Sequence, residues 1–334
     1  MVDSTRPRAA GDALHVPVLL DECFQLLEPA FSVPNPIMID ATLGMGGHSA
    51  AFLERCDRLT IIGIDRDPSA IELASERLAR FGSRFRAVQG TYDHIDAVAQ
   101  EFGHGGADRG TVDAVLMDLG VSSLQLDEEE RGFSYSHDAP LDMRMDKESG
   151  QTAAEIVALA DVKELTRILS HYGEERFASR IARRIVSERE RQPITRTTQL
   201  ADLVKDSIPA ATRRTGGNPA KRTFQALRIA VNDELAVLER AIPRAIASIR
   251  VGGRIAVECY QSLEDKIVKR EFASGATSTT PPGLPVELPG HEPYLRLLTR
   301  GAIKAHPHEA AMNPRSASVR LRAAERLREE GKSS

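Results

Sequence analysis

The sequence has no tryptophan, and aromatic residues make up only 4% of its 334 positions. Aromatic platforms for stacking nucleic-acid bases must therefore be few. The three cysteines, Cys23, Cys56 and Cys259, are scattered and odd in number, which fits neither a disulfide framework nor a zinc site. No apolar run is long enough to cross a membrane, and no signal-peptide core follows the first residues. We therefore expect a cytoplasmic protein that does not bind membranes.

Charge is distributed unevenly along the chain, although the net charge is only −4. Residues 1–126 carry 10 basic and 18 acidic side chains, net −8, and residues 127–150 carry a net −5. Residues 151–231 carry 15 basic and 9 acidic side chains, net +6, and residues 232–334 carry a net +3. An acidic first part beside a basic middle suggests that cofactor binding and polyanion binding are divided between regions.

Residues 37–49 join a short apolar run to a glycine-rich turn and then to a helical pattern. Gly44, Gly46 and Gly47 allow positive φ and a close approach to a ligand, and the first N–H groups of a helix have no partner within it. A second apolar run ends in Asp65, about 20 residues further on, where a carboxylate can accept both hydroxyls of a ribose. This pattern predicts a βαβ unit with an adenosine-type site.

Two further apolar runs continue this rhythm. Residues 85–89 predict a strand that ends near Tyr92, which is well placed to cover an adenine ring, although an ordinary loop tyrosine explains the spacing equally well. Residues 112–118 predict a strand that ends in Asp118 and is followed by Gly120, which puts a carboxylate and accessible backbone at the same crevice. The alternation of strands and helices predicts a parallel α/β sheet with helices on both faces.

The strand pattern stops after residue 126. Residues 127–222 contain several helical patterns but no convincing apolar strand, and prolines and glycines punctuate the later part. This predicts an all-helical subdomain inserted into the α/β core. The expected helices cover residues 155–159, 162–172 and 174–191.

The α/β pattern resumes after the insertion. We expect one long helix over residues 223–249, a turn over 251–254 and a fifth strand over 255–259. Residues 295–303 and 318–323 are expected to pair at the edge of the sheet. The predicted organisation is a first part of the core over residues 1–126, the insertion over 127–222 and a second part of the core over 223–334.

The glycine loop itself discriminates between cofactors. A nicotinamide dinucleotide fingerprint needs a third glycine or alanine where this chain has Ser49, which speaks against an oxidoreductase. Asp40, just before the loop, would repel a pyrophosphate but can hold the cationic amino-acid end of S-adenosylmethionine. The loop is similar to that of amino-methylating class I methyltransferases.

Longer strings strengthen this interpretation, beginning with Asp40-Ala-Thr-Leu-Gly-Met-Gly-Gly-His-Ser. Others follow in order at residues 118–127, 131–134, 140–146, 172–178, 223–232 and 261–270. Together they resemble the ribosomal RNA small subunit methyltransferase H family over about residues 15–322. The resemblance implies a class I, Rossmann-like core with a helical insertion, and S-adenosylmethionine as methyl donor. It also implies N4-methylation of a cytidine in the decoding region of bacterial 16S rRNA within the 30S subunit.

The resemblance also implies a set of site residues. Cofactor contacts fall on Gly46, Gly47, His48, Asp65, Tyr92, Asp118 and Gln125. Asp118 is in addition the candidate acceptor for the amine hydrogens, although contact with the cofactor alone is the simpler role. His48 more simply orients the loop, and it belongs to no expected metal site. The family often has phenylalanine at Tyr92 and Phe-His at Tyr260-Gln261, so a histidine base there cannot be assumed.

Substrate contacts are expected on the insertion. Its first part could clamp a splayed-out cytidine or form a charged hinge, through Arg131, Phe133, Asp142, Arg144 and Asp146. Helical spacing puts four arginines on one face, either to bind the rRNA backbone or as a solvated surface: Arg176, Arg180, Arg183 and Arg184. The alternative function is a non-catalytic RNA-binding protein that retains a nucleotide-binding loop. The oligomeric state stays open, a homodimer included.

Overall fold

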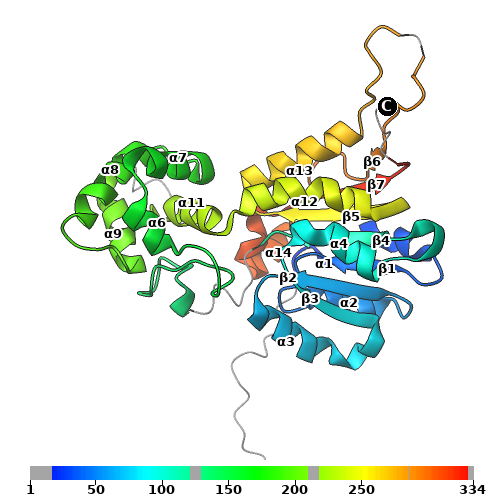
Figure 1. The fold of residues 1–334 in the computed structure, drawn as a ribbon, viewed down its shortest axis with the longest axis horizontal. Helices are drawn as coiled ribbons and strands as arrows, with labels where there is room; N and C mark the ends of the chain where they lie inside the picture. Colours follow the sequence, from blue (N-terminus) through cyan, green and yellow to red (C-terminus); the bar gives the residue numbers. More distant parts are fainter. Residues whose placement is uncertain (1–16, 121–128, 210–217, 285, 330–334) are drawn as a thin grey trace, which may run out of the picture.

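A computed structural model of the chain describes residues 17–120, 129–209, 218–284 and 286–329. Its centre is a seven-stranded sheet in the order β3-β2-β1-β4-β5-β7-β6, which confirms the predicted α/β class (Figure 1). The strands are β1 (Ile37–Asp40), β2 (Thr60–Asp65), β3 (Phe85–Gln89), β4 (Val112–Asp118), β5 (Ile249–Cys259), β6 (Leu295–Leu297) and β7 (Arg320–Arg326).

The first five strands are parallel, and the inner strands β1, β2 and β4 are buried on both faces. In β4, Val115 and Met117 point into one apolar layer, whereas Ala114 and Leu116 point into the other. This alternation follows from the two-residue period of a strand, and it explains why parallel strands read as continuous apolar runs. The helices of the first layer are α4 (Ile95–Phe102), α12 (Glu234–Ser248) and α13 (Ser262–Gly275). Those of the second are α1 (Leu20–Leu27), α2 (Gly47–Arg55) and α3 (Pro68–Leu78).

The last two strands close the edge of the sheet in the opposite direction. β7 is antiparallel to β5, with Glu258 opposite Leu321, and β6 is antiparallel to β7. The expected pairing near the C-terminal end is confirmed, although β6 is much shorter than predicted. The short helix α14 (Pro307–Met312) lies between β6 and β7 in the chain.

The helical subdomain has its own apolar core, to the left of the sheet in Figure 1. Its helices are α6 (Ala153–Leu159), α7 (Val162–Gly173), α8 (Ala178–Arg189), α9 (Thr197–Ser207) and α11 (Lys221–Asn232). Phe224 and Leu227 of α11 belong to this core, which therefore extends beyond residue 222. None of the helices that the structure describes is long and apolar enough to cross a membrane.

Two sequence expectations for the second part of the core are wrong. The long helix over 223–249 is two helices, because Asp233 adopts a left-handed conformation with φ of 52° and separates α11 from α12. The expected turn over 251–254 is instead part of β5, which begins at Ile249. Gly252, with φ of 81°, permits the irregular register opposite β4 that keeps this segment within the sheet.

Buried polar contacts join the subdomain to the core. Arg131, only 2% exposed, forms a salt bridge with Asp67 at the start of α3 and donates to the Met145 carbonyl oxygen at 2.7 Å. Asn232, at the end of α11, donates to the Met143 carbonyl oxygen at 2.8 Å and accepts from the Met145 N–H at 2.8 Å. These contacts fix the wall that the subdomain presents to the sheet.

Candidate active site

The glycine loop brings backbone N–H groups to the carboxyl end of β1. Gly44 and Gly46 have φ of 50° and 72°, values that disfavour residues with a side chain. A Cβ on Gly46 would also lie 2.8 Å from Leu78 Cδ1, so a side chain here would collide with α3. Gly46 is the N-cap of α2, and the loop therefore points the first N–H groups of that helix toward the crevice.

Asp65 is held at the end of β2 by the same loop. Its Oδ2 accepts the Gly44 N–H at 2.8 Å, and its Oδ1 accepts the Asp67 N–H at 2.9 Å. Burial raises the pKa of Asp65 to about 6, against the lowering effect of these hydrogen bonds. Each oxygen keeps a further lone pair, so the carboxylate can accept two hydroxyl groups.

Asp118 ends β4, and 26% of its side chain is accessible to solvent. Its Oδ1 accepts the Gly120 N–H at 3.1 Å, and its own N–H donates to Thr42 Oγ1 at 2.6 Å. Tyr260, just beyond β5, lies beside Asp118, and its pKa is raised first by burial and then by the nearby acids Asp118 and Glu258. The phenol therefore keeps its proton and can donate to the carboxylate. Tyr260 was left without a role by the sequence.

The loop after β5 is fixed by a buried acid. Glu264 is 3% exposed, and its Oε2 accepts the N–H groups of Tyr260 and Gln261 at 2.9 and 3.0 Å. Burial raises the pKa of Glu264 to about 8. Tyr92 is half-buried near Glu264 and Glu234, and its pKa is raised by desolvation first and by these acids second. The sequence predicted only a helix start at Glu264.

These elements surround one cavity of about 710 Å³ between the sheet and the helical subdomain. Its wall includes five of the predicted cofactor residues, namely Gly47, His48, Asp65, Tyr92 and Asp118. Gly46 is the N-cap of α2 and is not among the residues that line the cavity. Gln125 lies outside the described residues. The opposite wall comes from the subdomain and includes Phe133, Tyr135, Lys221, Phe224 and Gln225.

Comparison with known proteins agrees with this architecture. The model of the MraW methylase family matches residues 12–327. The chain belongs to the MraW methylase family. A protein from Beutenbergia cavernae, named ribosomal RNA small subunit methyltransferase H, is 59% identical and covers 96% of this chain and 95% of its own. One of the same name from Kocuria rhizophila is 58% identical, with coverages of 96% and 97%.

The cavity of this methylase fits S-adenosylmethionine, the methyl donor of the family. Its volume lies within the range of small-molecule sites, roughly 300–1,000 Å³. Asp65 offers acceptors for ribose hydroxyls, and the glycine loop offers backbone donors. Asp40 is a different case, because it is 2% exposed, accepts the Ser49 hydroxyl at 2.6 Å and does not line the cavity. The expected contact of Asp40 with the amino-acid end of the cofactor therefore stays a prediction.

Most residues of the expected cytidine clamp or charged hinge are paired with groups of the protein itself. Arg131 is buried against Asp67, and Asp142 is paired with Arg144 at 2.8 Å. Asp146 accepts the Glu148 N–H and the Ser149 hydroxyl. Among these residues only Phe133 reaches the cavity.

Two rings that the sequence did not single out join Phe133 on the cavity wall. Tyr135 and Phe224 meet edge to face, with centroids 5.7 Å apart. Phe224 belongs to the segment 223–232, which resembles the family. That resemblance was the sequence signal that could have identified Phe224 as a site residue. Helical periodicity alone assigns such a residue to the core.

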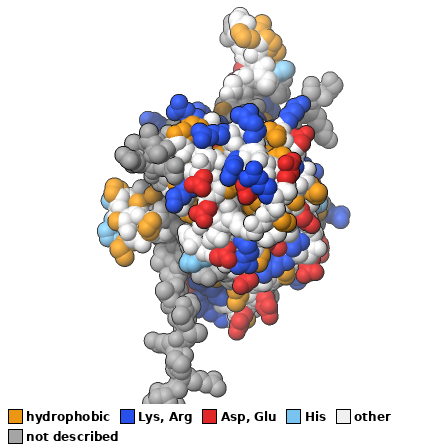
Figure 2. Space-filling view, turned by 90° about the vertical axis from the view of Figure 1, so that its left-hand side faces the viewer, with side chains coloured by type: hydrophobic (Ala, Val, Ile, Leu, Met, Phe, Trp, Pro, Cys, Tyr) orange, Lys and Arg blue, Asp and Glu red, His pale blue; other side chains and the backbone are white. Residues whose placement is uncertain are grey.

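The arginines of α8 divide into two groups. Arg189 donates to the Val157 and Ala160 carbonyl oxygens at 2.6 and 2.7 Å and so caps the end of α6. Arg180 and Arg183 are exposed, and no described acid lies within 4.0 Å of either, whereas Arg184 pairs with Glu188 at 3.3 Å. On this face of the molecule basic side chains are interspersed with acidic ones (Figure 2).

Proposed function

We propose that the protein transfers a methyl group from S-adenosylmethionine to N4 of a cytidine in the decoding region of bacterial 16S rRNA. The substrate is the 30S subunit, and the reaction takes place in the cytoplasm. The relatives' shared name, with its reference to small-subunit rRNA, supports the class of substrate. The observation that carries the proposal is the two-sided cavity, with Asp118 on the sheet side and three aromatic rings on the subdomain side.

The cofactor is assigned to the sheet side. Asp65 holds the ribose, the loop at Gly46 and Gly47 approaches the amino-acid end, and Tyr92 lies against the adenine. Gln125 and His48 complete the family's contact set. The fixed backbone partners of Asp65 support this assignment, because a carboxylate that is already oriented loses little freedom on binding.

The cytosine is assigned to the space between Asp118 and the aromatic wall. A base that has left its stack is held in such sites by aromatic faces and by hydrogen bonds to its edge. Phe133, Tyr135 and Phe224 supply rings, and Gln225 supplies an amide that can both donate and accept. Lys221 has no acid within 4.0 Å among the described residues and can contact a phosphate.

Asp118 is the group that acts on the amine. The cytosine N4 lone pair is delocalised into the ring, so nucleophilicity rises when an acceptor draws the N4 hydrogens out of the ring plane. S-adenosylmethionine supplies a methyl group that its sulfonium already activates. Asp118 accepts a hydrogen bond from one N4–H and takes up the proton that N4 loses when its bond to the methyl group forms and the sulfonium–methyl bond breaks. The hydrogen bond from the Gly120 N–H holds the carboxylate in place, and the Tyr260 phenol lies beside it. Positioning of this kind can supply roughly 7–11 kcal/mol of the barrier reduction.

Methyl transfer to unmodified subunits tests the proposal. Purified protein is incubated with radiolabelled S-adenosylmethionine and with 30S subunits from cells that lack the modification. The expected product is label in N4-methylcytidine after digestion to nucleosides, with 50S subunits as the control. Label in another nucleoside would show that the methylated position is not N4 of a cytidine. RNA binding without any transfer would favour the non-catalytic alternative.

A further inference from the structure

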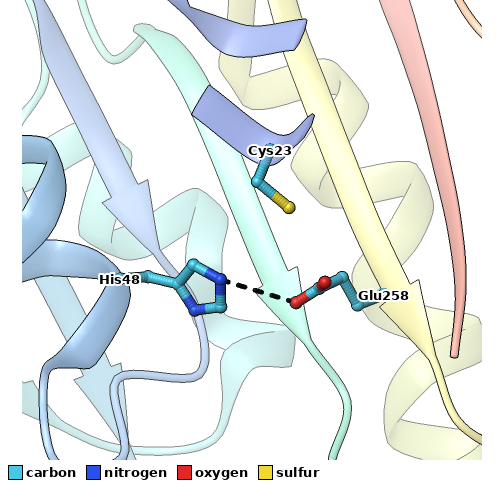
Figure 3. A group of neighbouring side chains, drawn as sticks. All are labelled: Cys23, His48 and Glu258. Atoms are coloured by element: carbon cyan, nitrogen blue, oxygen red, sulfur yellow. Dashed lines mark ion pairs between the residues drawn. The ribbon is translucent and has the colours of Figure 1, made fainter. Parts of the chain in front are cut away.

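Three side chains from different elements meet behind Asp118. Cys23 comes from α1, His48 from the start of α2 and Glu258 from β5 (Figure 3). The Cys23 Sγ, a His48 ring nitrogen and a Glu258 carboxylate oxygen all lie within 4.8 Å of one another. All three side chains are buried, with exposures of 0%, 6% and 0%. Such a group of sulfur, nitrogen and oxygen ligands matches the donors that zinc prefers.

The carboxylate of Glu258 is poorly compensated, because the basic group facing it is His48, whose Nε2 lies 3.7 Å away (Figure 3). Neither of its carboxylate oxygens accepts a hydrogen bond from the described part of the chain, although the residue is fully buried. The charged groups that act most strongly on it are Asp118, Glu309 and Glu22, all of them acids. A buried carboxyl group without partners is strongly unfavourable, and acidic surroundings make the site attractive to a cation.

The separation between His48 and Glu258 suits two ligands of one ion better than a direct hydrogen bond. His48 Nε2 lies 3.7 Å from Glu258 Oε2, which is too long for a hydrogen bond. Two ligands at tetrahedral angles and about 2.0–2.3 Å from a zinc ion are separated by about 3.3–3.6 Å. Only a small adjustment of side chains would therefore place an ion between them.

The second nitrogen of His48 completes a known pattern of metal sites. A metal-bound histidine almost always donates its other ring N–H to a carboxylate or carbonyl group. His48 Nδ1 lies 3.8 Å from Asp118 Oδ2 and must approach it by about 1 Å to donate a hydrogen bond. Nε2 also lies 3.2 Å from the Val18 carbonyl oxygen, which can accept its hydrogen when no cation is bound. Cation binding would move the ring proton to Nδ1, on the side of Asp118.

We propose that Cys23, His48 and Glu258 form a binding site for one zinc-class divalent cation. A thiolate and a carboxylate balance the two positive charges, so the loaded site is neutral in its buried position. The fourth position of the tetrahedron is taken by water. Bound cation fixes the His48 ring, which in turn orients Asp118 at the edge of the cavity. Occupancy of this site is measured without any substrate, so a failure of the proposed methyl transfer and a failure of cation binding can be told apart.

Metal binding to the full-length chain is the first test. Protein is treated with EDTA, transferred to metal-free buffer at pH 8 and titrated with Zn²⁺ or Co²⁺. The expected result is about one ion per chain by mass spectrometry of the metal. Co²⁺ should give a thiolate-to-metal charge-transfer band in the near ultraviolet. Absence of saturable binding to the wild-type chain would overturn the proposal.

Matched variants locate the ion. Cys23→Ser should abolish the charge-transfer band and weaken Zn²⁺ binding at least about 100-fold, and Glu258→Gln should weaken it at least about tenfold. Cys259→Ser and Cys56→Ser remove the other two thiols and should leave binding unchanged. A band that survives Cys23→Ser, or one that Cys56→Ser abolishes, would contradict the assignment.

Two further measurements separate ligation from a loss of folding. Zn²⁺ should raise the melting temperature of the wild type and of Cys259→Ser, but not that of Cys23→Ser, while circular dichroism shows that all three are folded. Asp118→Ala, which removes the acceptor on the other ring nitrogen, should weaken Zn²⁺ binding by about 10-fold. Equal stabilisation of the wild type and of Cys23→Ser would overturn the proposed ligand set.

Discussion

The two sides of the cavity hold their functional groups in different ways. On the sheet side, Asp65, Asp118 and Glu264 accept backbone N–H groups at the ends of strands or the start of a helix. On the subdomain side, Arg180 and Arg183 extend from a helix surface with no acid within 4.0 Å among the described residues. The first arrangement places a few atoms precisely for a small cofactor, whereas the second offers adaptable charge to a large polyanion.

The largest expected effect follows from reversing charge on the subdomain alone. Changing Arg180, Arg183 and Arg184 to Glu should abolish methylation of 30S subunits and lower the salt slope of binding by about three, because each phosphate contact adds roughly one unit. Affinity for S-adenosylmethionine should not change. The measurements are subunit binding at several salt concentrations and calorimetry of the cofactor.

A control variant with the same change in net charge at other positions tests whether the location of the arginines matters. Arg58, Arg86 and Arg109 are exposed on the α/β core, and their change to Glu should leave subunit methylation nearly unaffected. If both triple variants lose activity equally, or if the α8 variant keeps the wild-type salt slope, the arginines of α8 are only a solvated surface.

Asp118 lies where the two sides meet, so its loss should affect catalysis more than cofactor binding. Asp118→Ala should lower turnover by about 100-fold or more, a typical effect of removing a group that acts in the transition state. The dissociation constant of S-adenosylmethionine should rise less than tenfold. Single-turnover rates and calorimetry on the same preparation measure the two effects. A proportional loss in both would leave Asp118 with a cofactor role only.

A substitution at Asp65 should weaken cofactor binding without affecting subunit binding. Asp65→Ala removes charge-assisted hydrogen bonds that contribute roughly 1.5–3 kcal/mol each, so affinity for S-adenosylmethionine should fall at least about tenfold. Subunit binding and its salt slope should stay as in the wild type. Unchanged cofactor affinity in a folded variant would refute the ribose assignment.

The smallest expected effect is a pH dependence of cofactor binding. Burial raises the pKa of Asp65 to about 6, so the carboxylate is ionised above pH 6 and protonated below it. Because the ionised form accepts the ribose hydroxyls, the affinity should fall as pH decreases through 6, by about fivefold between pH 6 and pH 5. Calorimetry between pH 5 and 8 measures this, and Asp65→Ala should show a flat profile over the same range.

Much of the α/β core could be predicted, because its signals are local. The apolar runs, the glycine loop and the acids at Asp65 and Asp118 each lie within a few residues of the strand ends that position them. The break at Asp233 could not be predicted, since neither glycine nor proline marks it and the flanking residues are helical. Gly252 and Gly253 indicated a turn, yet the backbone continues as a strand opposite β4.

Contacts between distant segments were beyond the reach of sequence patterns. Phe224 lies on the cavity wall because α11 packs both in the subdomain core and against the site, which a periodic pattern cannot distinguish from ordinary burial. Cys23, His48 and Glu258 come from three segments that are widely separated in sequence, so no spacing motif relates them. Tyr260 acquires its partner Asp118 only because β5 pairs with β4.

The pairing of β4 with β5 also sets the order of events at the ribosome that makes this chain. Asp118 lies opposite Glu258, roughly 140 residues later in the sequence, so β4 has an unpaired edge while the intervening segment is translated. At synthesis rates of 5–20 residues per second this interval lasts roughly 7–28 seconds. The helical subdomain, with a core of its own, can fold within that interval. Chaperone binding to the nascent chain should therefore peak before β5 emerges and decline once it has paired.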